Sequence, residues 1–571
     1  MLLVAFLGLS LQLNAAQRAP AMQQYGHVAL IADSIRDVAH AHGSQTAFER
    51  FRRGVLPSGY GNAGRCDVRL GRFCWWYDGS LPVFPPEKDV IKARRRVLLA
   101  ELDASAAKYP GDNWLAGMRV HYRVEGRDFV AADSVARSCR AEAWWCAALV
   151  GYAAHAGGNA AIADSAFRGS LAAMPPDSAC AWRSIAPLLS DDDRDAYEHL
   201  ACEQRVTLDE RFWTLSRPQF SSAANDFRNE LGMRRVLTWL GARGTTPHLL
   251  PWGNDAAELV LRYGWPVAWS RQESSQFTGT TQNEGGVIGH DPSPSFVFTP
   301  ARWRVDSLKP LASSDWTLDE PRAESRFAPR QVRRVVPAVA QLARFRRNDS
   351  TLVVAAFSAK DDSLLAVSAV AGASGAVDAP ALSAPDTART GTSRIMLAGR
   401  PLIAGVDIID TTTRTLARMR QTFSVTIDSQ RVSLSDLLMY RAADVPAGVL
   451  DSALARAIPG DTVTRTRAVG IFWETYGLVA DGETLDIAVS VERVDHSWIR
   501  SARQRLGLTP VDTPIRIRWN DARPPSDRGA AHAISLDLAN LDSGRYRVTL
   551  SVTPAGGTSV YSVREIELID R

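Results

Sequence analysis

The feature that most restricts the fold of this chain is an internal repeat with a period of 31 residues. Trp114 corresponds to Trp145, and Gly126 corresponds to Gly157. The alanine-rich stretch around them, residues 20–205, has apolar residues three and four positions apart, which is the spacing of an amphipathic helix. A repeat of this length is typical of helical hairpins that stack, because a single hairpin leaves an apolar face uncovered. We therefore expect an α-helical region at the front of the chain.

The second copy of the repeat contains the other residues that a stacked hairpin needs. Residues 132–134 (Ala-Asp-Ser) recur as residues 163–165, and the second copy closes with Pro175. A small residue fits where two helices cross, and a proline ends the second helix. The pattern resembles the tetratricopeptide repeat at a slightly shorter period. Such arrays need at least three units, so we expect flanking helices at 92–108 and 191–202 to complete the stack.

The cysteines are confined to this helical region and lie in three close pairs. The pairs are Cys66 and Cys74, Cys139 and Cys146, and Cys180 and Cys202. An even number of cysteines at short separations in an exported chain is typical of a disulfide framework, and pairing between neighbours is its simplest form. A zinc site would need a Cys-x-x-Cys motif or nearby histidines, and the sequence has neither. Buried free thiols are the remaining alternative.

An apolar run at the start of the chain indicates export. Residues 2–13 are almost uniformly apolar and are followed by the small residues Ala15 and Ala16. The run is too short to cross a hydrocarbon core of about 30 Å, but it fits the apolar part of a signal peptide. We expect a periplasmic or extracellular protein without a transmembrane segment after cleavage; a buried N-terminal helix is the alternative. The small net charge of +4 argues against nucleic-acid binding.

The central segment contains a set of motifs at characteristic spacing. The motifs are residues 212–213 (Phe-Trp), 217–218 (Arg-Pro), 225–226 (Asn-Asp), 230 (Glu), 251–255 (Pro-Trp-Gly-Asn-Asp), 259–266 (Leu-Val-Leu-Arg-Tyr-Gly-Trp-Pro), and Phe296 with Phe298. Over residues 210–300 this set resembles the GWxTD domain family of bacterial envelope proteins. The name-giving motif has Pro251 in place of the Gly and Asn254 in place of the Thr. The resemblance implies an envelope protein with a signal peptide and β-sandwich tails, and it implies no particular activity.

Within this segment we expect a helix over 223–240 and a short strand over 259–262. Asp255 is predicted to cap the turn that enters the strand, and Trp252 to cover the core. Gly264 allows the sharp turn before the Trp-Pro pair. A structural corner is one interpretation of these residues, and a ligand pocket is the other. The candidate binding residues are Trp252, Asp255, Tyr263, Gly264, Trp265, Pro266 and Asn225.

Beyond the central segment the sequence is rich in predicted strands. Residues 322–347 hold eight arginines and one acid, Glu324, and indicate a basic linker, with contact to an anionic surface as an alternative. Short β-branched stretches between turn clusters follow. The expected fold is multidomain α + β: a signal peptide (1–16), tetratricopeptide-like helices with disulfides (17–205), a small GWxTD-like α+β domain (206–321), a β-sandwich with the basic linker (322–445) and an immunoglobulin-like β-sandwich (446–571).

The sequence contains no recognised catalytic or metal-binding motif. It has no Gly-x-Ser-x-Gly elbow, P-loop, dinucleotide fingerprint or His-Glu-x-x-His helix. We interpret residues 40–42 (His-Ala-His) as a solvated helix end, and residues 191–193 (Asp-Asp-Asp) as an acidic first turn of a helix rather than a calcium loop. His290 and Asp291 are neighbours beside a predicted mobile loop at 274–289, and we assign no role to them. We expect no cofactor and no metal.

Two classes of function remain. The first is a non-catalytic exported scaffold, whose helical repeats and central domain bind another envelope protein or a surface. The second is an envelope hydrolase that acts on glycan or peptide through the carboxylates Glu230, Asp255 or Glu258. Two carboxyl groups about 5–10 Å apart in a cleft would favour glycoside hydrolysis. Hydrogen bonds from backbone amides to Asp255 would instead favour a structural role for that residue.

Overall fold

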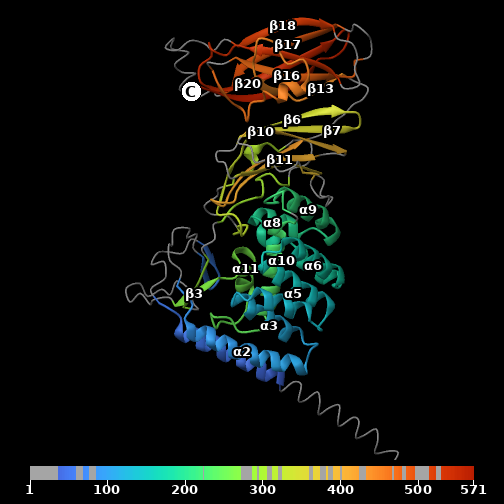
Figure 1. The fold of residues 1–571 in the computed structure, drawn as a ribbon. Helices are drawn as coiled ribbons and strands as arrows, with labels where there is room; N and C mark the ends of the chain where they lie inside the picture. Colours follow the sequence, from blue (N-terminus) through green and yellow to red (C-terminus); the bar gives the residue numbers. More distant parts are fainter. Residues whose placement is uncertain are drawn as a thin grey trace, which may run out of the picture. The chain divides into compact units, whose positions relative to one another are not determined.

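The structure of this chain is a computed structural model that contains helices towards the N-terminus and antiparallel sheets towards the C-terminus (Figure 1). It divides into two compact units, and each is described by itself. We call them the helical unit (1–202, 224–295 and 321–327) and the strand-rich unit (203–223, 296–320 and 328–571). The structure describes residues 37–58, 68–75, 85–222, 224–271, 286–291, 295–304, 311–318, 325–358, 364–372, 381–382, 390–398, 402–423, 432–465, 468–478, 484–494, 514–522 and 529–570.

The helical unit consists of helices and two short hairpins. A helix at residues 37–55 comes first. It is followed by α2 (Asp89–Lys108), α3 (Asn113–Glu125), α4 (Phe129–Arg137), α5 (Ala143–Ala156), α6 (Ala160–Ala173), α7 (Pro176–Arg183), η1 (Ala186–Leu188), α8 (Asp191–Glu198), α10 (Asp226–Gly241) and α11 (Asn254–Tyr263). The antiparallel hairpins are β1 (Val68–Leu70) with β2 (Phe73–Trp75), and β3 (Ala268–Arg271) with β4 (Val287–His290).

The 31-residue repeat forms two helix pairs, α3 with α4 and α5 with α6. Gly126 and Gly157 occupy the same place in the two copies, at the end of α3 and of α5. A Cβ atom on Gly151 of α5 would lie 2.8 Å from the ring of Phe167 of α6, so the glycine allows this pair to approach closely. The predicted helix at 92–108 is part of α2, which packs against α3. The resemblance to tetratricopeptide repeats itself stays a prediction.

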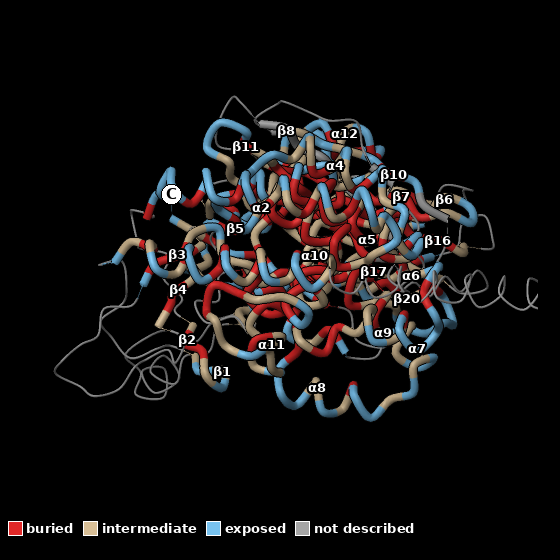
Figure 2. Tube along the Cα trace, turned by 90° about the horizontal axis from the view of Figure 1, so that it is seen from below, coloured by how far each residue is buried: buried red, intermediate tan, exposed pale blue. Residues whose placement is uncertain are grey.

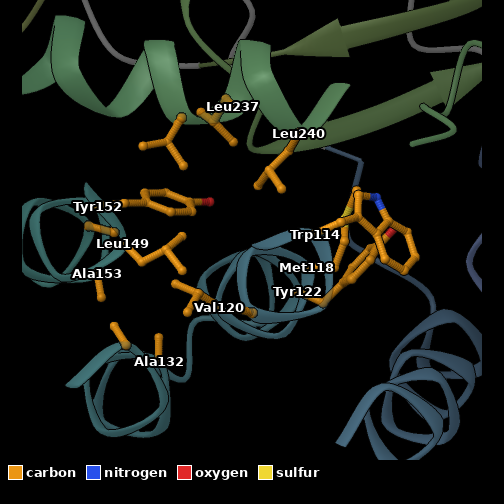
Figure 3. Packing of buried hydrophobic residues seen from close by; sticks show 14 of the residues in the cluster. Trp114, Met118, Val120, Tyr122, Ala132, Leu149, Tyr152, Ala153, Leu237 and Leu240 are labelled. Atoms are coloured by element: carbon orange, nitrogen blue, oxygen red, sulfur yellow. The ribbon is translucent and has the colours of Figure 1, made fainter. Parts of the chain in front are cut away.

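The core of the helical unit lies between α10 and the repeat helices (Figure 3). Leu237 and Leu240 of α10 point towards α5 and α3. Trp239 of α10 lies against Trp145 of α5, with 4.1 Å between ring centroids. Trp145 is fully buried, and its indole N–H donates to the backbone oxygen of Asn113 at 2.6 Å. Residues 224–295 therefore belong with the helical repeats, whereas residues 206–223 and 296–320 of the predicted central domain belong to the strand-rich unit.

The helix expected at 223–240 is confirmed as α10, but the strand expected at 259–262 is wrong. Residues 259–262 belong to α11, whose buried residues Ala256, Val260 and Tyr263 lie four and three positions apart, as a helix requires. A short apolar run does not by itself distinguish a strand from a buried helix. The sharp turn after it is present, because Gly264 has a φ of 83°, a conformation that favours glycine.

The strand-rich unit contains two pairs of sheets. The sheet orders are β10-β7-β6 with β5-β12-β11-β8-β9, and β13-β16-β14, to which β19 adds beside β16, with β15-β21-β20-β17-β18. The bounds are β5 (Arg334–Pro337), β6 (Val339–Arg347), β7 (Ser350–Ser358), β8 (Leu364–Gly372), β9 (Ala381–Leu382), β10 (Thr390–Ala398), β11 (Leu402–Asp410), β12 (Thr415–Phe423), β13 (Ser433–Leu434), β14 (Leu438–Arg441), β15 (Thr462–Thr464), β16 (Val469–Tyr476), β17 (Thr484–Arg493), β18 (Ile515–Ala522), β19 (Ala530–Leu536), β20 (Gly544–Pro554) and β21 (Val560–Ile569). The helices are α9 (Cys202–Leu215), η2 (Ser313–Asp315) and α12 (Leu450–Leu454).

Each pair of sheets encloses its own apolar core, as a β-sandwich does. In the first pair, Phe357 of β7 and Val406 of β11 belong to one buried cluster. In the second pair, Trp473 of β16 packs in a cluster with Ile487 of β17 and Leu550 of β20. Most of the strand pairings are antiparallel, and β5 with β12 and β15 with β21 are parallel.

The prediction of a basic linker at 322–347 is wrong for its second half, because β5 and β6 lie there. Two of the three arginines of β6 have carboxylate partners in the second sandwich. Arg344 donates to Asp436 at 2.9 Å, and Arg347 donates to Glu474 at 2.6 Å. These guanidinium groups are therefore neutralised inside the unit, which a linear count of arginines does not reveal.

The two disulfides that the structure describes join neighbouring cysteines as predicted, Cys139 to Cys146 and Cys180 to Cys202. Cys74 is also disulfide-bonded, and Cys66 lies outside the described residues. The predicted signal peptide, residues 1–16, lies outside them as well. Over the part of the chain that the structure describes, no helix combines the length and the apolar character needed to span a membrane.

Candidate functional site

Two of the polar groups singled out in the sequence have simple surroundings. The acidic stretch at 191–193 forms the first turn of α8, as predicted (Figure 2), and its first two residues are exposed. Ser190 caps that turn by accepting from the backbone N–H of Asp193 at 3.4 Å. Of the two histidines predicted to be solvated, His40 is exposed, but His42 is half-buried. Its ring stacks on Trp114 with 3.5 Å between centroids, and burial lowers its pKa.

The pair His290 and Asp291 does not act together. His290 lies in β4 and not in a loop, so the predicted loop at 274–289 is wrong for its last residues. The Nε2 atom of His290 is 2.7 Å from the hydroxyl of Ser270, while the carboxylate of Asp291 forms an ion pair with Arg326 at 2.7 Å. The two neighbouring side chains thus have separate partners.

Four of the predicted binding residues meet in one place. Trp252, Gly264, Trp265 and Pro266 line a small hole in the helical unit, which we call the aromatic pocket. Its volume is about 40 Å³. Pockets for drug-sized ligands hold roughly 300–1,000 Å³, so this one does not take a peptide segment.

The other three predicted binding residues have structural partners. Asn225 caps α10, because its side-chain oxygen accepts from the backbone N–H of Phe227 at 3.1 Å and of Arg228 at 3.2 Å. The ring of Tyr263 stacks on Trp75 with 4.4 Å between centroids. Both contacts hold elements of the helical unit together.

Asp255 is the third, and it joins α11 to the β1–β2 hairpin. Its carboxylate accepts from Nε and Nη2 of Arg72, both at 2.8 Å, from the backbone N–H of Arg72 at 3.1 Å, and from that of Ala256 at 2.8 Å. These bonds, above all those from the Arg72 side chain, lower the pKa of Asp255. The predicted role as the cap of a strand is wrong, because α11 is a helix, and the backbone bonds identify a structural carboxylate.

The remaining carboxylates of the hydrolase hypothesis are also occupied. Glu230 accepts from Arg234 Nε at 2.7 Å and lies 2.9 Å from Nε2 of His155. Burial alone would raise the pKa of Glu230, but Arg234 and His155 together lower it. Glu258 accepts from two guanidinium groups, those of Arg194 and Arg262.

A second cavity of the helical unit was not predicted from the sequence. It is a cleft of about 880 Å³, which we call the basic cleft, and it lies among the helix at 37–55, α2, α3, the start of α4, and β3. Its volume falls in the range of known ligand sites. The charged residues of its lining are Arg52, Lys92, Arg95, Arg96, Arg123 and Arg127, against Glu87, Glu125 and Asp128.

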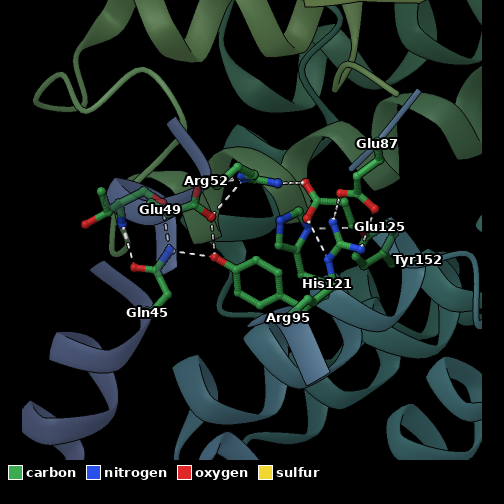
Figure 4. A network of polar contacts seen from close by, with 10 residues as sticks. Gln45, Glu49, Arg52, Glu87, Arg95, His121, Glu125 and Tyr152 are labelled. Atoms are coloured by element: carbon green, nitrogen blue, oxygen red, sulfur yellow. Dashed lines mark hydrogen bonds and ion pairs between the residues drawn. The ribbon is translucent and has the colours of Figure 1, made fainter. Parts of the chain in front are cut away.

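A chain of alternating charges forms part of the wall of the basic cleft (Figure 4). Glu125, the last residue of α3, accepts from Arg52 Nη1 at 2.6 Å and lies 3.4 Å from Nε of Arg95. Arg52 also binds Glu49, through Nε at 2.9 Å and Nη2 at 2.8 Å. Arg95 forms a further ion pair with Glu87. The chain fixes the helix at 37–55, α2 and α3 to one another.

The two buried carboxyl groups of this chain differ in their acidity. Burial raises the pKa of Glu49 to about 7 against the opposing effect of Arg52, and the hydroxyl of Tyr122 donates to this carboxylate at 2.6 Å. Burial would raise the pKa of Glu125 too, but Arg52 and Arg95 lower it to about 2. Glu125 is therefore charged at neutral pH, while Glu49 changes its charge there.

Two cations of the basic cleft are accessible to a ligand. Arg96 and Arg127 are exposed and form no ion pair within the described part of the chain. Lys92 and Arg123, in contrast, each pair with an aspartate. The lining also has apolar groups, among them Val267, which is 54% exposed. The cleft thus offers positive charge next to an apolar surface.

Comparison with known proteins assigns neither a family nor a function to this chain. No family model matches the chain, and no curated protein matches it. A solved structure described as the structural basis of neurohormone perception by the receptor tyrosine kinase Torso matches with 9% identity, over 40% of this chain and 73% of that chain, at a TM-score of 0.12. A likeness at that TM-score carries no argument about fold or function.

Proposed function

We propose that this chain is a non-catalytic interaction protein of the bacterial cell envelope, and that its basic cleft binds an acidic, partly apolar segment of another envelope protein. The observation that carries the proposal is the excess of cations in a cleft of about 880 Å³, together with the guanidinium groups of Arg96 and Arg127, which form no ion pair with any residue that the structure describes. Complementary charge steers a partner to such a surface, and apolar contacts retain it. Val267 supplies an apolar contact at the same cleft.

Export is supported by the cysteines. The disulfides Cys139–Cys146 and Cys180–Cys202 belong to a framework that forms in oxidising compartments such as the periplasm and the extracellular space. The resemblance of residues 210–300 to the GWxTD family and the apolar run at 2–13 point to the same location.

An envelope hydrolase is the alternative, and the surroundings of its carboxylates do not favour it. A general acid at neutral pH needs a raised pKa. The pKa of Glu230 and that of Asp255 are lowered instead, and Glu258 is bound by two arginines. Glu49 has a suitable pKa of about 7, but it is 1% exposed and held by Arg52 and Tyr122.

The test is a charge reversal in the basic cleft. A fluorescent peptide of alternating Glu and Leu should bind the full chain, and Arg96→Glu with Arg127→Glu should weaken binding by about tenfold, which corresponds to about 1.4 kcal/mol. Arg94→Glu is the matched control, because Arg94 is an exposed arginine of α2 that does not line the cleft. Fluorescence anisotropy measures the three affinities.

Two results would overturn the proposal. One is equal affinity of the chain for the Glu-Leu peptide and for a Gln-Leu peptide of the same length. The other is an equal loss of affinity in the double variant and in Arg94→Glu, because the charge of the cleft would then have no special role. Cross-linking in the native envelope can afterwards identify the partner.

A further inference from the structure

Several residues that line the aromatic pocket have buried nitrogen atoms that lack hydrogen-bond partners within the described part of the chain. Within the described residues, no partner is present for Nε1 of Trp75, Trp265 and Trp269, or for Nδ1 of His248. All four residues line the aromatic pocket, and Trp269 and His248 are each only 8% exposed. A buried donor without an acceptor costs about 1–3 kcal/mol, and native proteins rarely leave several together. The pocket therefore lacks a hydrogen-bond acceptor.

The size of the aromatic pocket restricts what this acceptor can be. The volume is about 40 Å³. A water-sized group needs roughly 10–15 Å³ on this scale, so about three such groups fit. A carboxylate group has this size, whereas a sugar ring or an aromatic side chain is too large.

The electrostatic surroundings of the pocket favour an anion. Burial, and after it the positive charges of Arg53, Arg52 and Arg72, lower the pKa of His248 to about 4. The described lining of the pocket contains no aspartate or glutamate. A pocket for a cation would have the opposite features, since aromatic cages bind quaternary ammonium groups through the faces of their rings.

We propose that the aromatic pocket binds the carboxylate of a small organic acid, with the indole N–H groups of Trp75, Trp265 and Trp269 donating to its oxygens. This site is separate from the basic cleft, and it does not depend on the function proposed for that cleft. Acetate, with four heavy atoms, should bind with a dissociation constant no tighter than about 40 μM, which is the limit for so small a ligand.

Indole resonances give a direct test in the full-length chain. We would label tryptophan with ¹⁵N and replace chloride by acetate at constant ionic strength. The N–H resonances of Trp75, Trp265 and Trp269, assigned by single substitution to phenylalanine, should shift together and saturate with one dissociation constant. Formate should act in the same way, and tetramethylammonium should have no effect.

Variants separate the hydrogen bonds from the shape of the pocket. Trp265→Phe keeps an aromatic ring and removes the N–H, so acetate should bind about tenfold more weakly. Trp144→Phe is the control, because the indole N–H of Trp144 already donates to Glu142, away from the pocket, and affinity should not change. Near-ultraviolet circular dichroism verifies that both variants are folded.

Three outcomes would overturn the proposal. The first is the absence of any saturable shift, which would mean that the pocket holds internal water only. The second is saturable binding of tetramethylammonium in place of acetate. The third is wild-type affinity for acetate in a folded Trp265→Phe variant.

Discussion

The helical unit and the strand-rich unit both bury arginine–carboxylate pairs, but they use them differently. In the strand-rich unit, Arg420 and Asp407 are completely buried and 2.6 Å apart, and Asp407 also accepts from the backbone N–H of Phe220 at 2.8 Å. In the helical unit, Arg52 is shared by Glu49 and Glu125, and this chain of charges borders an open cleft.

The difference shows how a buried carboxylate behaves when it has its own guanidinium partner and when it shares that partner with a second carboxylate. Asp407 has one guanidinium partner and two backbone donors, the N–H groups of Phe220 and Ser221, so its carboxylate is satisfied locally and holds the segment around Phe220 against the sheet. Burial raises the pKa of Glu49 to about 7, because Arg52, which Glu49 shares with Glu125, offsets only part of the effect of burial. The first arrangement is suited to stability, and the second makes stability depend on pH.

The largest effect is expected for Asp407→Ala. Removing one member of a buried ion pair leaves Arg420 uncompensated, and such changes cost about 3–5 kcal/mol. Denaturant unfolding of the full chain measures the loss. Asp486→Ala is the control, because Asp486 pairs with the exposed Arg518, and solvent screens such a surface pair so that its loss should change stability far less. Equal losses in the two variants would contradict the comparison.

An intermediate effect is expected from the pH dependence of Glu49. Its pKa in the folded chain is about 7, above the ordinary value of 4.5, so its contribution to stability is complete below pH 4.5 and is lost as the pH rises through 7. A shift of this size corresponds to roughly 2–4 kcal/mol. Glu49→Gln should remove this part of the pH dependence.

Unfolding free energies between pH 5 and 8 measure this effect. The stability of the wild type should fall relative to that of Glu49→Gln as the pH rises. Parallel curves for the two proteins would show that the pKa of Glu49 is not raised, and they would remove the contrast between the two units.

The smallest effect is expected for Asp255→Ala. This carboxylate and its partner Arg72 are partly exposed, with side chains 17% and 26% accessible, so solvent screens their attraction. The bonds to the hairpin should still contribute about 1 kcal/mol, seen as a lower melting temperature. Unchanged melting together with lost binding of acetate or of the acidic peptide would show that Asp255 belongs to a binding site.

Local patterns in the sequence predicted a large part of the fold. The 31-residue repeat predicted the helix pairs, and the close spacing of the cysteines predicted the disulfides Cys139–Cys146 and Cys180–Cys202. Short β-branched and apolar stretches between turn clusters predicted the strand-rich second half of the chain. For the site, the motif at 251–266 located the aromatic pocket, although several of its residues proved to be structural. Its helix α11 was mistaken for a strand, because a short apolar run fits both.

The basic cleft could not be predicted in this way, but one signal for it exists. Arg95 occupies the apolar face of α2, where Ile91 and Leu98 are its buried neighbours. A cation at such a position needs a buried partner, and this partner was not identifiable, because Glu125 follows 30 residues later on another helix. An ion pair between residues that are far apart in the sequence cannot be recognised from the sequence alone.

The sequence by itself determined the secondary structure of the repeats, the pairing of neighbouring cysteines and the division into a helical part and a strand-rich part. These features depend on residues that lie at most about 31 positions apart in the sequence. Only the tertiary structure decided which charges are neutralised and where a cleft remains open. Arg52 and Trp269 line the same cleft although more than 200 residues separate them, and no local preference acts over such a distance.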